Sequence, residues 1–366
     1  MAAKGKRTPF YEMHLRDGAK MVNFAGFVMP IFYHSIVAEH RRVRSSVGMF
    51  DLSHMGEIEV RGPEALKFVQ KVTTNDASKL TLDRVQYSAM CYPDGGVVDD
   101  LLVYRLKDYF LLVVNATNIE KDFNWLKENL EGDVDLEDRS DQSALLAVQG
   151  PRAEDVLAKL SKVNLQDLKY YYAIRGRVDG VEMVFSRTGY TGEDGFELYF
   201  LPNYAQKLWD SVREAGREYE IAPIGLGARD SLRLEMGYCL YGNDIDKTTT
   251  PLEAGLGWIT KFGAKDFIGK KALLEQKEKG IRRRLVALEL EGMAFPRQGY
   301  PIFLDGKERG KVTSGGFSPS LNKGIGLGYL PIEASAIRTK LEVEIRGRLV
   351  AGQVVKAPFY KCGSHR

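Results

Sequence analysis

The segment RTGYTGEDGFEL, from Arg187 to Leu198, combines glycines, hydroxyl groups and one carboxylate in an apolar strand pattern. Gly189, Gly192 and Gly195 recur at every third residue, and glycine permits turns in which the backbone approaches a flat ligand closely. Glu197 follows among large apolar residues, so we expect its carboxylate to be buried and compensated by hydrogen-bond donors. The segment predicts a pocket for a molecule with paired N–H groups.

A second group of chemical interest is Asp99-Asp100, inside the apolar run 97–104. Neighbouring strand residues point to opposite faces, so one carboxylate is expected to face a site and the other to face elsewhere. Alternatively, both cap the turn after Gly95-Gly96 or pair with arginines. A carboxyl group buried in an apolar cleft has a raised pKa, which suits proton transfer or the stabilisation of a transient cation.

Arg229 stands in GLGARDSLRLEMGY, a glycine-led turn that enters a predicted helix. Its planar guanidinium could anchor a ligand carboxylate. The commoner alternative for such an arginine is an ion pair with Asp230 or Glu235. Aromatic side chains near these motifs could stack on a ligand ring, although a single tyrosine is more often part of a core or a rim; they are Tyr87, Tyr190, Tyr238 and Tyr241.

The remaining reactive residue types indicate no metal or nucleotide chemistry. His54, in DLSHMGE, is interpreted as a hydrogen-bonded structural histidine, with a site-lining role as the alternative. The three cysteines are far apart and form no CxxC pair, which argues against a disulfide framework and a zinc site. The chain has no GxxxxGK[ST] motif, and the glycines of 324–330 lack dinucleotide-binding spacing. No GxSxG nucleophile motif is present either.

Length and composition place these groups in a globular protein of two or three domains. The chain has 366 residues, of which 44% are hydrophobic and 28% charged. Its net charge of +3 gives no support for a nucleic-acid partner. The segment Met1–Thr8 is polar and basic, and no run of apolar residues is long enough to span a membrane. We therefore expect a cytoplasmic protein.

Two short segments of the chain resemble each other. VRGPEALKFVQKV, from Val60, and VQGPRAEDVLAKL, from Val148, each predict a strand end, a Gly-Pro turn and an amphipathic helix. Proline is expected at the first helical position, where its missing N–H costs nothing. The pair suggests two similarly built α/β subdomains.

The other elements follow from turn residues and periodicity. Segment 86–114 predicts an antiparallel meander, and helices are expected at 34–46, 118–130, 204–219 and 270–279. From 283 to 360 the chain consists of short strands between glycine-rich turns, which indicates a small β-barrel or sandwich.

Six motifs, taken in order, resemble the glycine cleavage system T-protein (aminomethyltransferase) family over essentially the whole chain. They are SVGMFDLSHMGEI, YSAMCYPDGGVVDDLLVY, VVNATNIEKDFNW, RTGYTGEDGFEL, GLGARDSLRLEMGYCLYGNDID and TTTPLEAGLGW. The resemblance implies an α+β fold: a three-domain clover-leaf with two related α/β subdomains, antiparallel sheets, a C-terminal β-barrel and a central folate channel. We place a folate-binding region at 1–278, with subdomains at about 51–139 and about 1–50 with 140–278, and the barrel at 279–366.

The resemblance also implies roles for individual residues. Glu197 takes the position that holds the pterin ring of tetrahydrofolate, and Asp100 that of the critical acid near the carbon being transferred. The other expected folate-site residues match the family motifs or lie beside them: Tyr87, Asn115, Tyr190, Arg229, Met55, Tyr170, Tyr171 and Tyr238. The family's C-terminal tail reaches its folate, but KCGSHR departs too far from the family pattern to nominate a residue.

The implied reaction moves the methylene of an aminomethyl group from the dihydrolipoyl arm of H-protein to tetrahydrofolate. It gives 5,10-methylenetetrahydrofolate and ammonia, needs no metal or nucleotide, and is coupled to the P- and L-proteins. Alternatives are a folate-dependent demethylase and a non-catalytic folate-binding factor for iron-sulfur assembly. Factors of the second kind carry a KGCYxGQE pattern, which this chain lacks. Arg41, Arg42 and Arg44 are candidates for docking an acidic H-protein.

Overall fold

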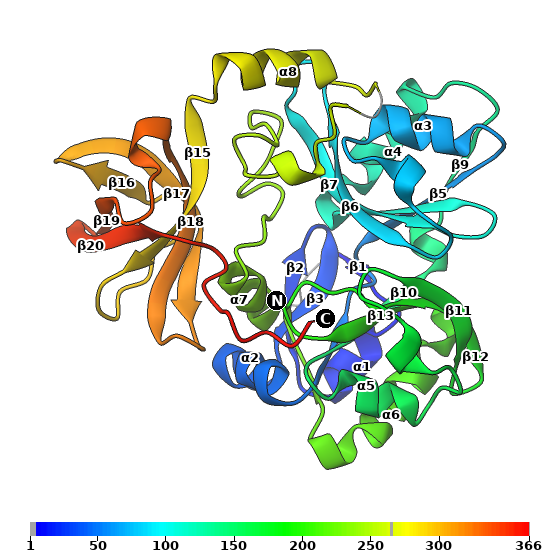
Figure 1. Ribbon diagram of the computed structural model, residues 1–366. Helices are drawn as coiled ribbons and strands as arrows, with labels where there is room; N and C mark the ends of the chain where they lie inside the picture. Colours follow the sequence, from blue (N-terminus) through cyan, green and yellow to red (C-terminus); the bar gives the residue numbers. More distant parts are fainter. Residues whose placement is uncertain (1–4, 264–265, 366) are drawn as a thin grey trace.

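Three lobes meet around a common centre in the computed structural model, which describes residues 5–263 and 266–365 (Figure 1). Two lobes are built on predominantly antiparallel sheets with helices, and the third is a closed β-barrel. The predicted α+β clover-leaf with a C-terminal barrel is therefore confirmed. Residues 1–4 of the basic segment Met1–Thr8 lie outside the described residues. No helix within the described ranges is long and apolar enough to cross a membrane.

The first lobe, coloured mainly cyan in Figure 1, holds a sheet in the order β6-β7-β8-β5-β9. The predicted meander is present as β6 to β8, and two helices accompany the sheet. The elements are β5 (Gly56–Arg61), α3 (Ala65–Val72), β6 (Val85–Cys91), β7 (Val97–Arg105), β8 (Phe110–Val114), α4 (Ile119–Glu128) and β9 (Asp135–Asp138).

The second lobe combines the start of the chain with residues beyond the first lobe, in a sheet of order β11-β12-β13-β10-β4-β14. Its strands are β4 (Gly48–Asp51), β10 (Ala144–Gln149), β11 (Ala173–Val178), β12 (Val181–Ser186), β13 (Gly195–Phe200) and β14 (Ala222–Pro223). A smaller sheet has the order β1-β3-β2, with β1 (Lys6–Arg7), β2 (Lys20–Phe24) and β3 (Phe27–Phe32). The helices are α1 (Tyr11–Arg16), α2 (Ile36–Ser45), α5 (Ala153–Ala158), α6 (Ala205–Ala215) and α7 (Leu226–Glu235). The predicted helix 204–219 is shorter because α6 ends at its C-cap, Gly216.

The third lobe is a closed barrel of order β15-β18-β17-β16-β19-β20, joined to the rest by α8 (Lys270–Lys279). Its strands are β15 (Arg283–Leu290), β16 (Pro301–Leu304), β17 (Lys307–Ser318), β18 (Lys323–Pro331), β19 (Lys340–Ile345) and β20 (Arg348–Val355). Figure 1 shows the chain after β20, in red, leaving the barrel and returning to the second lobe. The subdomain bounds remain predictions.

Each lobe has its own apolar core, and a further cluster joins the two sheets. That cluster includes Phe50, Tyr104, Leu111 and Tyr199, all buried, from β4, β7, β8 and β13. Both β10 and β13 are buried along their whole length. The site residues on these strands are therefore carried by a rigid, two-sheet support.

The two similar segments adopt similar structures. Gly62 and Gly150 have φ values of 107° and 133°, and each is followed by a turn and a helix. The helices begin at Ala65 and Ala153, so the prolines lie in the turn rather than at the first helical position. The conformation of each glycine, which other residues rarely adopt, determines where the chain leaves the strand.

Candidate functional site

A cavity of about 1850 Å³ lies where the three lobes meet. All ten predicted site residues line it, although they come from segments far apart in the chain: Met55, Tyr87, Asp100, Asn115, Tyr170, Tyr171, Tyr190, Glu197, Arg229 and Tyr238. The barrel contributes lining residues from β15, β17 and β18, among them Val286 and Phe317. Pockets for drug-sized ligands have volumes of roughly 300–1000 Å³, so this cavity has room for a large ligand or for two.

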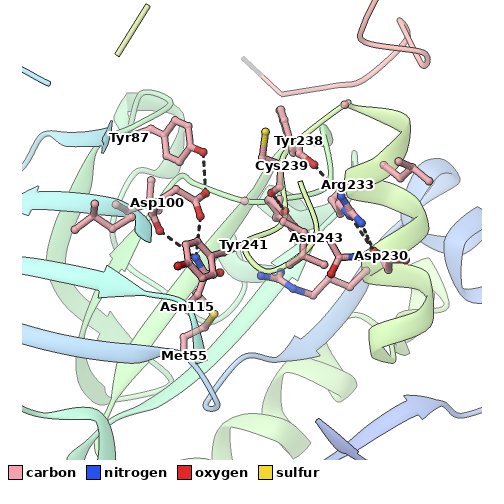
Figure 2. A pocket seen from close by; sticks show the side chains of 18 of the residues that line it. Met55, Tyr87, Asp100, Asn115, Asp230, Arg233, Tyr238, Cys239, Tyr241 and Asn243 are labelled. Carbon is pink, nitrogen blue, oxygen red and sulfur yellow. Dashed lines mark hydrogen bonds and ion pairs between the residues drawn. The ribbon is translucent and has the colours of Figure 1, made fainter. Parts of the chain in front are cut away.

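Asp100 presents its carboxylate to the cavity from β7 (Figure 2). The Tyr87 hydroxyl donates to Oδ2 at 2.7 Å, and Asn115 Nδ2 donates to Oδ1 at 2.9 Å. Burial, followed by the charge of Asp99, raises the pKa of Asp100 to about 7, against the lowering effect of those two hydrogen bonds. The carboxyl group can therefore exchange a proton near neutral pH.

The neighbouring Asp99 is fully buried and is not part of the cavity lining, so the two carboxylates face opposite sides as predicted. The alternative that both cap the preceding turn is wrong. Asp94 caps it instead, since its Oδ1 accepts the Gly96 N–H at 3.0 Å.

Glu197 lies on β13, opposite Ala147 of β10 and Ser186 of β12. Its side chain lines the cavity and accepts a hydrogen bond from the Thr188 hydroxyl, the one donor that it meets among the described residues. Burial raises the pKa of Glu197, whereas Thr188 and the charge of Arg229 lower it. Because protein donors do not satisfy both oxygens, the carboxylate can accept donors from a ligand.

Arg229 projects from α7 over the ring of Tyr190, with 4.8 Å between the guanidinium carbon and the ring centre. It makes no ion pair with any described carboxylate. The expected ion pair belongs to the next turn of the helix, where Arg233 lies 2.7 Å from Asp230 and 2.9 Å from Asp244. The commoner alternative for Arg229 is therefore wrong, and its guanidinium is available to an anionic group.

Four of the tyrosines that line the cavity form two pairs. The rings of Tyr190 and Tyr238 are stacked with centres 5.6 Å apart, and those of Tyr170 and Tyr171 meet edge to face at 4.8 Å. Tyr171 has a φ of 62°, which is uncommon for a bulky residue and costs conformational energy. These pairs give the cavity rigid, flat walls that suit a planar ligand.

The glycines of 187–198 serve the protein's own packing more than the expected ligand approach. A Cβ atom on Gly189 would lie 2.0 Å from Oε1 of Gln149, and one on Gly195 would lie 2.6 Å from the carbonyl oxygen of Val148. Gly192 has a φ of 79°. Of these three glycines, only Gly189 lines the cavity.

His54 takes the site-lining role that was the less favoured alternative from its sequence context. It lines the cavity with 2% of its surface exposed, and its Nδ1 has no hydrogen-bond partner among the described residues. Burial and the charge of Arg229 lower its pKa to about 4, so the ring is neutral at pH 7. The interpretation as a hydrogen-bonded structural histidine is therefore wrong.

Trp258 and His365 also line the cavity without having been predicted there. The Trp258 side chain is 61% exposed and lies beside Tyr87, with 5.9 Å between the ring centres. His365, near the end of the chain, lies 5.5 Å from the Tyr170 ring. Only the long-range return of the C-terminal tail brings it there, so no local pattern could have revealed it.

The proposed basic docking group is divided in the structure, because Arg41 is exposed and Arg42 half-buried while Arg44 lies in the interior. The Arg44 side chain is 7% exposed and pairs with Glu193 at 2.8 Å and Glu235 at 2.9 Å. Arg42 pairs with Glu220 at 2.6 Å. Arg44 is therefore an interior ion-pair residue, and the docking hypothesis is wrong for it.

Comparisons with known proteins agree with this architecture. The GCVT N-terminal domain family matches residues 10–264, and the glycine cleavage T-protein C-terminal barrel domain family matches residues 283–361. The aminomethyltransferase of Halothermothrix orenii is 51% identical over 355 residues, which cover 97% of this chain and 99% of that protein. The aminomethyltransferase of Chloroherpeton thalassium is 52% identical over 357 residues, covering 97% and 98%.

A solved structure gives the same result in three dimensions. The crystal structure of the glycine cleavage system aminomethyltransferase T from Bartonella henselae superimposes with a TM-score of 0.93. It is 36% identical in sequence, and the match covers 99% of both chains. The chain belongs to the glycine cleavage T-protein family of aminomethyltransferases.

Proposed function

We propose that this chain transfers the methylene carbon of an aminomethyl group, carried on the dihydrolipoyl arm of glycine cleavage H-protein, to tetrahydrofolate. Folate N5 and N10 form bonds to the carbon as its bonds to the arm's sulfur and to nitrogen break. The products are 5,10-methylenetetrahydrofolate, ammonia and H-protein with a reduced arm, which the P- and L-proteins of the system reload and reoxidise. Tetrahydrofolate is a co-substrate in this reaction.

The observation that carries this proposal is the environment of Asp100. With N5 bonded to the carbon, a cation of iminium type forms once both the sulfur and ammonia have left and before N10 attacks, and a nearby carboxylate stabilises that charge. Tyr87 and Asn115 each hold one of its oxygens in place, so little reorganisation is needed as the charge develops. With a pKa of about 7, Asp100 can also orient the folate nitrogens in either protonation state.

Glu197 is proposed as the pterin anchor. A pterin offers a 2-amino group and a ring N–H side by side, and a carboxylate accepts both together. The stacked pair Tyr190 and Tyr238 suits the flat ring, and Arg229 suits an anionic part of the folate. The other proposed contacts are Met55, Tyr87, Asn115, Tyr170 and Tyr171.

The test separates the two carboxylates. Asp100→Asn should bind tetrahydrofolate about as tightly as the wild type in calorimetry and should lose most ammonia release from aminomethylated H-protein. Glu197→Ala should weaken folate binding. Asp108→Asn is the matched control, because Asp108 is exposed in the turn of the same β7–β8 hairpin, and it should leave both measurements unchanged.

Near wild-type turnover by Asp100→Asn, or unchanged folate affinity in Glu197→Ala, contradicts the corresponding role. A wild-type protein that binds folate but releases no ammonia from aminomethylated H-protein would instead point to a demethylase or a non-catalytic folate-binding factor.

A further inference from the structure

A second carboxylate lies directly behind the proposed catalytic one. Asp99 has no exposed surface, and its oxygens accept three N–H groups. These are the Asn115 backbone N–H at 3.0 Å, Asn115 Nδ2 at 2.8 Å and Asn118 Nδ2 at 2.7 Å. All three are N–H donors, which suit the oxygens of a carboxylate. The proposed function leaves this buried carboxyl group unexplained.

Asn115 connects the two carboxylates. Its Nδ2 lies 2.8 Å from Asp99 Oδ1 and 2.9 Å from Asp100 Oδ1. The amide carries two hydrogens, so one can point to each carboxylate. Asp99 also accepts the backbone N–H of Asn115. Because Asp99 binds both the backbone and the side chain of Asn115, it fixes the side-chain amide relative to the Asn115 backbone.

We propose that Asp99 is a positioning residue for Asp100, acting through the side chain of Asn115. The inference rests on the role of Asp100 under the proposed function. Asp99 is one residue away on the opposite face of β7, so it is outside the cavity and touches no substrate. Its contribution is to hold one Nδ2 hydrogen of Asn115 toward Asp100, which fixes the carboxylate in the orientation that faces the reacting carbon.

Asp122 and Lys121 lie behind Asp99. Asp122 on α4 is fully buried, and its carboxyl group hydrogen-bonds to that of Asp99. Burial and the Asp99 charge raise the pKa of Asp122 well above its usual range, so Asp122 carries a proton and is neutral at pH 7. The Lys121 ammonium lies 3.5 Å from Asp122 and over the ring of Tyr241, and it donates to the Val98 carbonyl oxygen rather than to the Asp99 carboxylate.

The groups that face Asp100 are neutral except for Asp99. Tyr87, Tyr190 and Cys239 have pKa values raised by burial, so they are uncharged at pH 7. After burial, the charge of Asp99 is the largest influence that raises the pKa of Asp100. Asp99 therefore holds the carboxyl group in place and keeps its titration near neutral pH.

The test compares two isosteric changes in the full-length chain. Asp99→Asn removes a charge, whereas Asp122→Asn replaces one neutral group with another. The titration of Asp100 is followed by NMR of ¹³C-labelled aspartate carboxyls, assigned with Asp100→Asn, and kcat and KM for ammonia release are measured across pH. In Asp99→Asn, the Asp100 pKa should fall by about one unit or more, and kcat should fall by about tenfold or more while KM for folate changes less. In Asp122→Asn, both should stay close to wild type.

An unchanged Asp100 titration in Asp99→Asn, or an equal shift in Asp122→Asn, would overturn the inference. If circular dichroism shows that Asp99→Asn does not fold, Asn118→Ala is the second variant, because it removes one donor from Asp99 and keeps the charge. It should lower kcat by several-fold with little change in the Asp100 titration, and an unchanged kcat would also refute the proposal. The titration needs no turnover, so it remains informative if the proposed function fails.

Discussion

Replacing Arg44 by methionine should destabilise the second lobe strongly. Arg44 belongs to α2, but its guanidinium joins Glu193, before β13, to Glu235 at the end of α7. It also lies 4.1 Å from the ring centre of Tyr360, in the tail that returns from the barrel. Methionine keeps an unbranched stem of similar width and removes the charge. Arg44→Met therefore leaves two buried carboxylates without their common partner.

The expected magnitude follows from the burial of all three groups. Arg44, Glu193 and Glu235 have side chains that are 7%, 2% and 0% exposed. Removing one partner of a buried ion pair costs about 3–5 kcal/mol, because the remaining charge is uncompensated. We expect a loss in this range in the free energy of unfolding, measured by urea titration with the fluorescence of Trp209, which lies in the core of the same lobe.

Arg42→Met is the matched control, two residues away on the same helix. Its partner Glu220 is 75% exposed, and ion pairs of this kind contribute about 1 kcal/mol or less. Arg44→Lys, which keeps the charge but cannot reproduce the planar fork, should fall between the two methionine variants. The reasoning is refuted if Arg44→Met costs no more than Arg42→Met.

Two further predictions concern pH. In Tyr87→Phe, Asp100 loses a hydrogen bond that lowers its pKa, so this pKa should rise above about 7. The acidic limb of the pH profile for ammonia release should therefore move to higher pH. A shift to lower pH would contradict this prediction. Burial raises the pKa of Glu235, but His40 and other partners lower it to about 2, below its usual 4.5. Ionised Glu235 should contribute about 3 kcal/mol to the free energy of unfolding. This contribution should be fully present above pH 4.5 and lost as the pH falls toward 2. In urea titrations, Glu235→Gln should lose less stability in acid than the wild type, and an equal loss would contradict the prediction.

Local sequence was sufficient for the elements that carry the site. Strand alternation predicted that Asp99 and Asp100 face opposite sides, because successive side chains of a strand must do so. Turn residues predicted the meander of β6 to β8 and the strand-rich C-terminal lobe, which the structure confirms. The motifs nominated ten residues that all line one cavity, while their individual roles remain proposals.

Contacts between distant segments were not predictable from such patterns. A helix pattern places Arg229 and Arg233 one turn apart, but the positions of Asp230 and Asp244 in space decide that, among the described residues, Arg233 is ion-paired and Arg229 is not. Likewise, an arginine-rich helix predicts an exposed basic surface, but the buried ion pairs with Glu193 and Glu235 place Arg44 in the interior.

The sequence by itself determined which residue types stand at which strand and helix positions, and hence the lobes and the candidate carboxylates. Only the tertiary structure decided the surroundings of each charged or polar group: that Gln149 fills the space beside Gly189, that His54 Nδ1 meets no partner in the described part of the chain, and that Asp99 shares Asn115 with Asp100. Backbone periodicity is a local property, set by neighbours in the chain. Burial, ion pairing and proton affinity depend on groups brought together from distant segments, so they are settled only when the lobes pack.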